Sequence, residues 1–234
     1  MGLMKSRLLH AAPQVPIVDL LHGVPDFNAH AGAHFLDALA AGFPTGVVFL
    51  CVVDPGVGGP REAAVLRADG RWFVGPDNGL LSVVAARARQ VETWRIQWRP
   101  EDLSDTFHGR DLFAPVAAEI AAGHFPASYL TPAGLEVQFD GADLPRVIYI
   151  DHYGNAWTGI RGGLTETGDH IEVRGQSLPW RRTFSDAAKG EAFWYVNSVG
   201  LVEIAANRAS AAGMLGLKVG DPVKLSGSRE SRLH

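Results

Sequence analysis

The chain has 234 residues, of which 47% are hydrophobic and 20% are charged, and its formal net charge is −4. This composition is typical of a globular protein, and the length suits one large domain or two smaller ones. The slightly acidic balance argues against a dedicated nucleic-acid-binding protein, which would carry a basic face. The sequence has no apolar run long enough to span a membrane and no apolar core of a secretion signal, so the expected location is the cytoplasm.

The first half of the chain predicts strands that alternate with helices. Strands are predicted at 16–20 (PIVDL), at 47–53 and, as a hairpin that turns at Asp69-Gly70, at 63–75. Helical spacing of apolar residues predicts helices at 28–42, 79–89 and 111–123. The single cysteine, Cys51, stands within an apolar strand and is expected to be an inert buried thiol. Interleaved strands and helices predict an α/β layer domain over residues 1–128.

The second half changes character at about Pro145, where short strand-like runs separated by turn residues begin. The runs are RVIYID, AWTGI, HIEV, AFWYVN and LVEIA, and one helix at about 209–216 interrupts them. Closely spaced short strands predict a small, all-β, barrel-like domain over residues 145–225. Prolines and glycines predict a linker at 129–144, and the polar residues 226–234 predict a disordered tail.

The stretch VVDPGVGGPR, residues 52–61, places a lone acid at the end of a predicted buried strand. Ligands of open α/β sheets bind beyond the carboxyl ends of the strands, so Asp54 is a candidate for ligand chemistry. The glycines of the loop allow a close approach of the backbone and let Arg61 fold back toward Asp54. Taken alone, a structural ion pair that closes the loop explains these two residues better than catalysis does.

Two further stretches carry polar residues next to predicted helices. In GPDNGLL, residues 75–81, helix capping by Asp77 or Asn78 is the simpler explanation of the acid and the amide. TFHGRDLFAPVAA, residues 106–118, places His108 beside a glycine just before a helix. A single histidine is usually structural, but one that accompanies two other acid-bearing strand ends is a candidate catalytic residue.

In this order and spacing, the three stretches resemble the S-adenosylmethionine hydroxide adenosyltransferases, relatives of the S-adenosylmethionine-dependent fluorinase and chlorinase. The resemblance extends from about Gly2 to Val223 and includes IDHYGNAWTGI and NSVGLVEIAAN in the second half. It implies an α/β domain followed by a barrel-like β domain. It also implies a homotrimer, in which ligand sites lie between the N-terminal domain of one subunit and the C-terminal domain of its neighbour.

The reaction implied by the resemblance is displacement at the 5′ carbon of S-adenosylmethionine by water, which gives adenosine and methionine. Because the sulfonium is already a good leaving group, the enzyme has to hold a water molecule in line with the C–S bond. By resemblance, Asp54, Arg61 and His108 are the triad that orients this water and favours its hydroxide-like form. The halogenating relatives lack this triad. S-adenosylmethionine is the substrate, and neither a cofactor nor a metal is expected.

The resemblance also implies substrate contacts, several of which have a simpler structural explanation. Phe27 corresponds to an aromatic beside the ribose and Phe107 to a wall of the 5′ carbon, although either would also suit a hydrophobic core. Asp151 is implied to bind the methionine ammonium and Asn155 the adenine edge, although a β-turn explains Asn155 equally well. The remaining implied contacts are Asn78 in the GPDNGLL loop, Phe184 against the adenine, and Ser198 at the methionine carboxylate. Val199 stands where the fluorinase has an arginine.

Members of the family open with a strand that ends in a T-D-F-G motif, whose acid holds the ribose hydroxyls. This sequence begins within the helix that follows, so weak substrate binding is expected unless another residue holds the ribose. Three other functions stay open: a non-catalytic protein that binds S-adenosylmethionine or adenosine, an S-adenosylmethionine-dependent halogenase, and a metal-dependent hydrolase. The last is disfavoured because the sequence has no HExxH motif and no paired cysteines.

Overall fold

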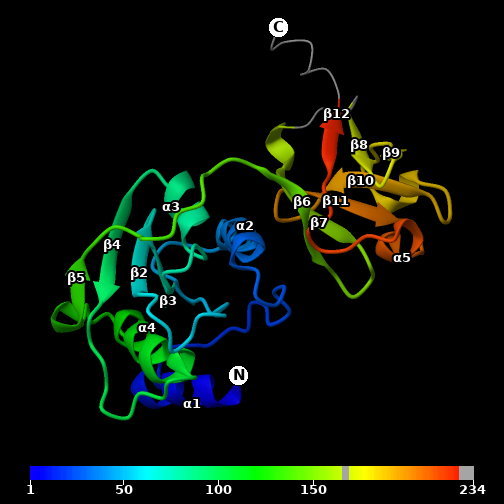
Figure 1. Ribbon diagram of the computed structural model, residues 1–234. Helices are drawn as coiled ribbons and strands as arrows, with labels where there is room; N and C mark the ends of the chain where they lie inside the picture. The colour runs from blue at the N-terminus through cyan, green and yellow to red at the C-terminus, as the bar shows by residue number, and fades with distance from the viewer. Residues whose placement is uncertain (165–168, 227–234) are drawn as a thin grey trace, which may run out of the picture. The chain divides into compact units, whose positions relative to one another are not determined.

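The computed structural model describes residues 1–164 and 169–226, which form two compact units (Figure 1). The first unit is Met1–Gly141, and the second begins at Ala142. Each unit has its own hydrophobic core. Within the described residues, no helix is both long enough and apolar enough to cross a membrane.

The first unit is built around a sheet with the strand order β1-β3-β2-β4-β5. Its strands are β1 (Val48–Leu50), β2 (Ala63–Ala68), β3 (Arg71–Pro76), β4 (Val91–Ile96) and β5 (Leu130–Pro132). β1 runs parallel to β3, whereas the other neighbours pair in the antiparallel direction. The predicted hairpin is confirmed, because Asp69 and Gly70 join β2 to β3 with φ angles of 46° and 78°, as a primed two-residue turn requires.

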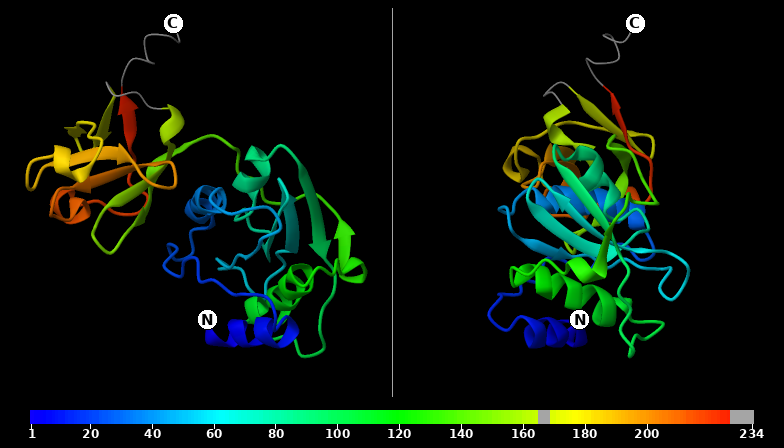
Figure 2. Two further views of the ribbon diagram at one scale, coloured as in Figure 1. Left: turned by 180° about the vertical axis from the view of Figure 1, so that it is seen from behind. Right: turned by 90° about the vertical axis from the view of Figure 1, so that its left-hand side faces the viewer.

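Helices cover both faces of this sheet. They are α1 (Gly2–Ala11), α2 (Ala29–Ala40), α3 (Ser82–Arg87), the π-helical turn η1 (Gly109–Phe113) and α4 (Ala114–Ala121). On one face, Val116 of α4 shares a core with Val65 of β2. On the other face, Ala40 of α2 and Val84 of α3 share a core with Leu66, the next residue of β2. Figure 2 shows that α4 lies between α1 and the sheet, so α1 forms an outer layer.

The second unit is mostly β-structure. Its strands are β6 (Leu144–Ile150), β7 (Ala156–Arg161), β8 (His170–Val173), β9 (Gln176–Leu178), β10 (Ala192–Val196), β11 (Leu201–Ala206) and β12 (Lys224–Ser226). A helix, α5 (Ala211–Leu215), and a short 3₁₀ turn, η4 (Phe184–Asp186), connect some of them. The described strands form one sheet in the order β10-β11-β7-β6 and another in the order β12-β8-β9. Ile204 and Ile171, one from each sheet, lie in the same core.

The mixed α/β class predicted from the sequence is confirmed, whereas the barrel-like description of the second unit is not. The described strands of that unit form separate sheets and no closed barrel. Residues 130–132, within the predicted linker, form β5 and join the sheet of the first unit. The predicted tail at 226–234 lies outside the described residues from 227 onward.

The strand predicted at 16–20 is wrong. The segment has no regular structure, and Val18 is 73% exposed. The segment lines a cavity of about 680 Å³. Residues 47–53, which include β1, line the same cavity, so the two segments border a common space and do not pair. The expectation for Cys51 is confirmed, because the thiol is buried and burial raises its pKa to about 12.

Candidate functional site

Two polar side chains from separate parts of the first unit, Asp54 and His108, meet at Arg61. Its Nε donates a hydrogen bond of 2.8 Å to Oδ1 of Asp54, and its Nη2 pairs with Oδ2 of the same carboxylate. The same Nη2 lies 2.9 Å from Nδ1 of His108. The side chains of Asp54 and Arg61 are 5% and 11% exposed, so the ion pair is largely withdrawn from water. The structure therefore brings together the acid, the arginine and the histidine that the sequence singles out.

A glycine explains how the two loops of this cluster come so close. Gly58 has a φ of 77°, and a Cβ atom at this position would lie 2.4 Å from the carbonyl oxygen of Asp105. Only a residue without a side chain tolerates both the positive φ and this approach. Gly58 thus lets the loop between Asp54 and Arg61 pack against the segment that leads into His108.

His108 is held in its neutral form. An arginine side chain has hydrogen-bond donors only, so Nδ1 of His108 accepts from Arg61 and the ring proton is assigned to Nε2. Burial of the imidazole, followed by the positive charge of Arg61, lowers the pKa of His108 below its ordinary 6.5. Nε2–H is therefore a donor that His108 can offer to a ligand or a water molecule.

The ring of Phe113 supports both basic side chains of the cluster. Phe113 is fully buried, and its ring centroid lies 5.2 Å from the guanidinium carbon of Arg61 and 6.5 Å from the imidazole of His108. Phe113 ends η1, the π-helical turn that starts directly after His108. Such turns are rare and occur frequently at functional sites. The sequence analysis missed Phe113, because helical spacing explains it as an ordinary core residue.

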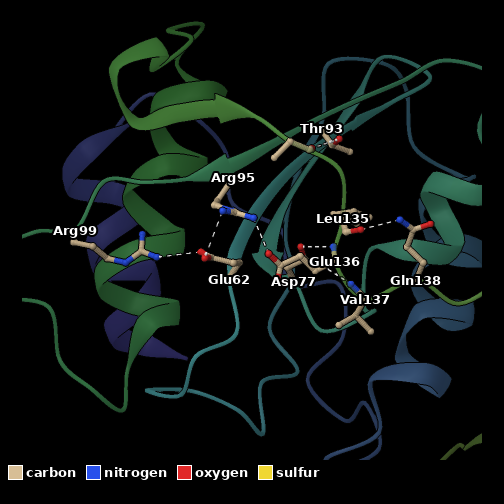
Figure 3. A network of polar contacts seen from close by, with 10 residues as sticks. Glu62, Asp77, Thr93, Arg95, Arg99, Leu135, Glu136, Val137 and Gln138 are labelled. Atoms are coloured by element: carbon tan, nitrogen blue, oxygen red, sulfur yellow. Dashed lines mark hydrogen bonds and ion pairs between the residues drawn. The ribbon is translucent and has the colours of Figure 1, made fainter.

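A polar network continues from Arg61 through Glu62, and Figure 3 shows Glu62 with its partners Arg95 and Arg99. Nη1 of Arg61 donates to the carbonyl oxygen of Glu62 at 3.3 Å. The carboxylate of Glu62 lies 3.8 Å from Arg95 and 3.7 Å from Arg99. The positive charge of Arg99 also contributes to the lowered pKa of His108. The sequence offered no signal for this network, since Glu62 is distant in sequence from Arg95 and Arg99 and the three match no motif.

No side chain caps α3, and the side chains of Asp77 and Asn78 bond to backbone groups outside this helix, including the N–H of Leu80 just before it. The carboxylate of Asp77 accepts the backbone N–H of Glu136 at 2.8 Å (Figure 3). Nδ2 of Asn78 donates to the carbonyl oxygen of Val53 at 2.8 Å. The predicted capping role is wrong, and Asn78 instead fixes the residue that precedes Asp54.

The two aromatic residues predicted near the ribose differ in their surroundings. Phe27 is 82% exposed and has a φ of 60°, a backbone region that residues other than glycine rarely adopt. The alternative explanation of Phe27 as a core aromatic is therefore wrong, and its strained, exposed position is typical of a functional loop. Phe107 is partly buried, and the guanidinium carbon of Arg110 lies 4.7 Å from the centre of its ring.

Asp151 and Asn155 lie in one turn between β6 and β7 of the second unit. Oδ1 of Asp151 accepts the backbone N–H groups of Tyr153 and Asn155, both at 2.9 Å. Oδ2 of Asp151 accepts Nδ2–H of Asn155 at 3.0 Å. The β-turn explanation of Asn155 is thus the observed geometry, and this turn holds the two predicted ligand contacts side by side.

Phe184 and Ser198 belong to the same unit. The ring of Phe184 is 37% exposed and lies edge-on against Tyr195, with the ring centroids 5.5 Å apart. Ser198 is exposed in the turn between β10 and β11. Over residues 1–164 and 169–226, no group of three or more His, Cys, Asp or Glu side chains is arranged to hold a metal ion.

Comparisons with known proteins agree with this arrangement of two units. The domain described as SAM hydroxide adenosyltransferase N-terminal domain matches residues 1–130, and the C-terminal domain of the same name matches residues 145–224. The chain is 38% identical to the (R)-S-adenosyl-L-methionine hydrolase of Thermus thermophilus, over 96% of this chain and 93% of that protein. It is 29% identical to a fluorinase of Nocardia brasiliensis, over 94% of this chain and 90% of that protein.

A solved structure extends the likeness to three dimensions. An uncharacterized conserved protein from Thermotoga maritima superposes with a TM-score of 0.87 and 31% sequence identity, covering 97% of this chain and 94% of that chain. The two domain matches together span most of the sequence, and both carry the same family description. The chain belongs to the SAM hydroxide adenosyltransferase family.

Proposed function

We propose that this chain hydrolyses S-adenosylmethionine at the 5′ carbon of the ribose, with adenosine and L-methionine as the products. The observation that carries this proposal is the bridging of Asp54 and His108 by Arg61. Identity supports the same reaction, since the relative at 38% is named a hydrolase and the relative at 29% a fluorinase.

The chemistry assigns a separate task to each of the three side chains. The oxygen of a water molecule attacks the 5′ carbon in line with the C–S bond, and the electron pair of that bond passes to sulfur, which leaves as the neutral thioether of methionine. Asp54 has lone pairs beyond those that Arg61 occupies, so it accepts a hydrogen bond from the water and then takes its proton. Arg61 holds the carboxylate of Asp54 in place through two hydrogen bonds. Nε2–H of His108 donates to the water oxygen, so a remaining lone pair of that oxygen points at the 5′ carbon.

The proposal includes a set of substrate contacts and an assembly. Phe27, Asn78 and Phe107 of the first unit contact the ribose side of the substrate. The contacts from the second unit are Asp151, Asn155, Phe184 and Ser198. The active form is a homotrimer with its ligand sites between subunits, and it works without a cofactor or a metal. In support, the two sets of residues belong to different units of the chain.

Substitution of the triad tests the proposal. Asp54→Asn and His108→Ala should each lower the turnover number for adenosine formation by roughly 100-fold or more, the usual range for acid–base groups. Adenosine affinity should stay close to wild type, because both groups face the water rather than the base. Asp102→Asn is the matched control, since Asp102 forms an exposed pair with Arg7 and should keep full turnover. If a triad variant kept wild-type turnover, the substituted residue would have a structural role and no catalytic one.

The same assay, read by chromatography of the nucleoside products, separates the competing functions. With a chelator present, the wild-type protein should form adenosine at an unchanged rate, whereas a metal-dependent hydrolase would lose activity. With added chloride or fluoride, adenosine should remain the product. A 5′-halo-adenosine as the main product would overturn hydrolysis in favour of halogenation, and binding without any product would identify a non-catalytic binding protein.

A further inference from the structure

The two faces of strands β10 and β11 pack into different hydrophobic clusters. Val202 and Ile204 of β11 pack into the main core of the second unit, whereas Ala205 packs into a smaller cluster with Phe193 of β10. Successive side chains of a strand point to opposite faces, so Glu203 lies on the face of the smaller cluster. It is 2% exposed, and the proposed reaction does not use it.

The buried carboxylate of Glu203 has two donors. Oε1 accepts the hydroxyl proton of Tyr195 at 2.8 Å, and Oε2 accepts Nδ2–H of Asn197 at 3.0 Å. Tyr195 in turn contacts the ring of Phe184, the proposed adenine contact. A carboxylate is costly to bury, and an apolar side chain would serve a core of this kind at least as well. Its presence therefore calls for a role beyond stability.

Asn197 connects Glu203 to the surface of the unit. Oδ1 of Asn197 accepts the backbone N–H groups of Val199 and Leu201, at 3.1 Å and 3.0 Å. These two bonds fold the turn between β10 and β11 and present Ser198, the proposed contact of the methionine carboxylate. Because both backbone bonds occupy Oδ1, the amide of Asn197 cannot turn over, and Nδ2 must point at Glu203.

We propose that Glu203 is a positioning residue for the methionine end of S-adenosylmethionine: through Asn197 it fixes the turn that holds Ser198. This inference rests on the proposed function, because that function supplies the ligand of Ser198. Both carboxyl oxygens of Glu203 matter, because Oε1 accepts from Tyr195 while Oε2 accepts Nδ2–H of Asn197. Glu203 acts through Asn197 and does not touch the substrate.

The test compares two ligands by calorimetry in the whole chain, with every protein carrying His108→Ala so that S-adenosylmethionine is not consumed during the titration. Glu203→Gln keeps the side-chain shape and replaces one of the two acceptor oxygens by an NH2 donor, so the dissociation constant of S-adenosylmethionine should rise about tenfold. The dissociation constant of adenosine, which lacks the methionine, should change less than about twofold. Val202→Ala is the control, since Val202 is the neighbouring core residue on the opposite face. It should lower the melting temperature without altering either dissociation constant.

Hydrogen exchange supplies a readout that needs no ligand. In Glu203→Gln, the amides of Val199 and Leu201 should exchange faster relative to the amide of Ile204. Unchanged exchange at these amides, or an equal loss of affinity for both ligands, would overturn the inference. Turnover is measured separately: wild-type protein that binds S-adenosylmethionine without forming adenosine would overturn the proposed function and leave the positioning role of Glu203 standing.

Discussion

At the scale of single residues, the guanidinium of Arg61 determines which atoms of its neighbours are available. Its donors occupy one lone pair on each oxygen of Asp54 and the Nδ1 lone pair of His108. A protonated His108 would carry a hydrogen at Nδ1, lose the contact with Arg61 and place two positive charges together. The arrangement is therefore compatible with neutral His108 alone.

A pH profile tests this reading of His108. The pKa of His108 lies below its ordinary 6.5, so the acidic limb of the rate of adenosine formation should be centred below pH 6.5. Stability follows the same direction: the unfolded chain takes up the proton first, so stability falls as the pH drops below 6.5. The measurement is kcat/KM against pH, with circular dichroism as the control for folding. An acidic limb centred at or above pH 6.5 would contradict the neutral, arginine-bound state.

Resemblance to family motifs singled out Asp54, Arg61 and His108, but no motif pointed to the residues that support them. Asp54, Arg61 and His108 stand in recognisable motifs next to predicted elements, and the close approach of two loops at Gly58 lets them meet in space. Phe113 could not be predicted as their support, because its position depends on a π-helical turn rather than an α-helical one. Glu203 was likewise missed, since an acid within an apolar strand carries no signal of the donors that surround it.

At the scale of elements, local signals were sufficient where one short stretch determines the structure. The Asp69-Gly70 turn determines the hairpin. The helix predicted from residue 28 onward is α2, and the side chain of Asn28 caps it by accepting the N–H of Ala31. Strands that depend on distant partners were less predictable. The apolar pattern at 16–20 indicates a strand, but a strand needs a neighbour, and this segment borders a cavity. β5 was hidden in the predicted linker because its pairing partner, β4, was not predicted either.

Gly58 allows a prediction at this scale. Gly58→Ala should destabilise the protein by roughly 1–3 kcal/mol, because alanine is strained at a φ of 77° and its Cβ would collide with the backbone of Asp105. Turnover should fall at least tenfold, since displacement of the segment before His108 disturbs the triad. Thermal unfolding and steady-state kinetics measure the two effects.

Gly134→Ala is the matched control for this substitution, because a Cβ at Gly134 has nothing within 4 Å. It should leave both the melting temperature and the turnover number near wild type. A Gly58→Ala protein with wild-type turnover would show that the contact between the two loops is unimportant for the triad.

At the scale of the whole molecule, the two units divide the proposed site residues between them. The first unit holds the triad, and the second holds Asp151 and Ser198. The domain matches cover both units, so each has a counterpart in the family. Such a division allows sites to be completed between subunits, as proposed for the homotrimer.

Mixing two inactive variants tests this assembly. His108→Ala and Asp151→Asn should each be weakly active alone. An equimolar mixture that has exchanged subunits should regain about a quarter of the wild-type activity, because every trimer that contains both variants has one intact site in three and about three quarters of randomly assembled trimers contain both. Sedimentation equilibrium should show the mass of a trimer. A monomer with full activity, or no recovery in mixtures that have exchanged subunits, would contradict shared sites.

The central claim is that Asp54, Arg61 and His108 direct a water molecule to the 5′ carbon of S-adenosylmethionine. The most direct measurement is the reaction in ¹⁸O-labelled water, followed by mass spectrometry of the products. The account predicts adenosine that carries one ¹⁸O atom at its 5′ hydroxyl, together with unlabelled methionine. Unlabelled adenosine, or methylthioadenosine in place of adenosine, would contradict it.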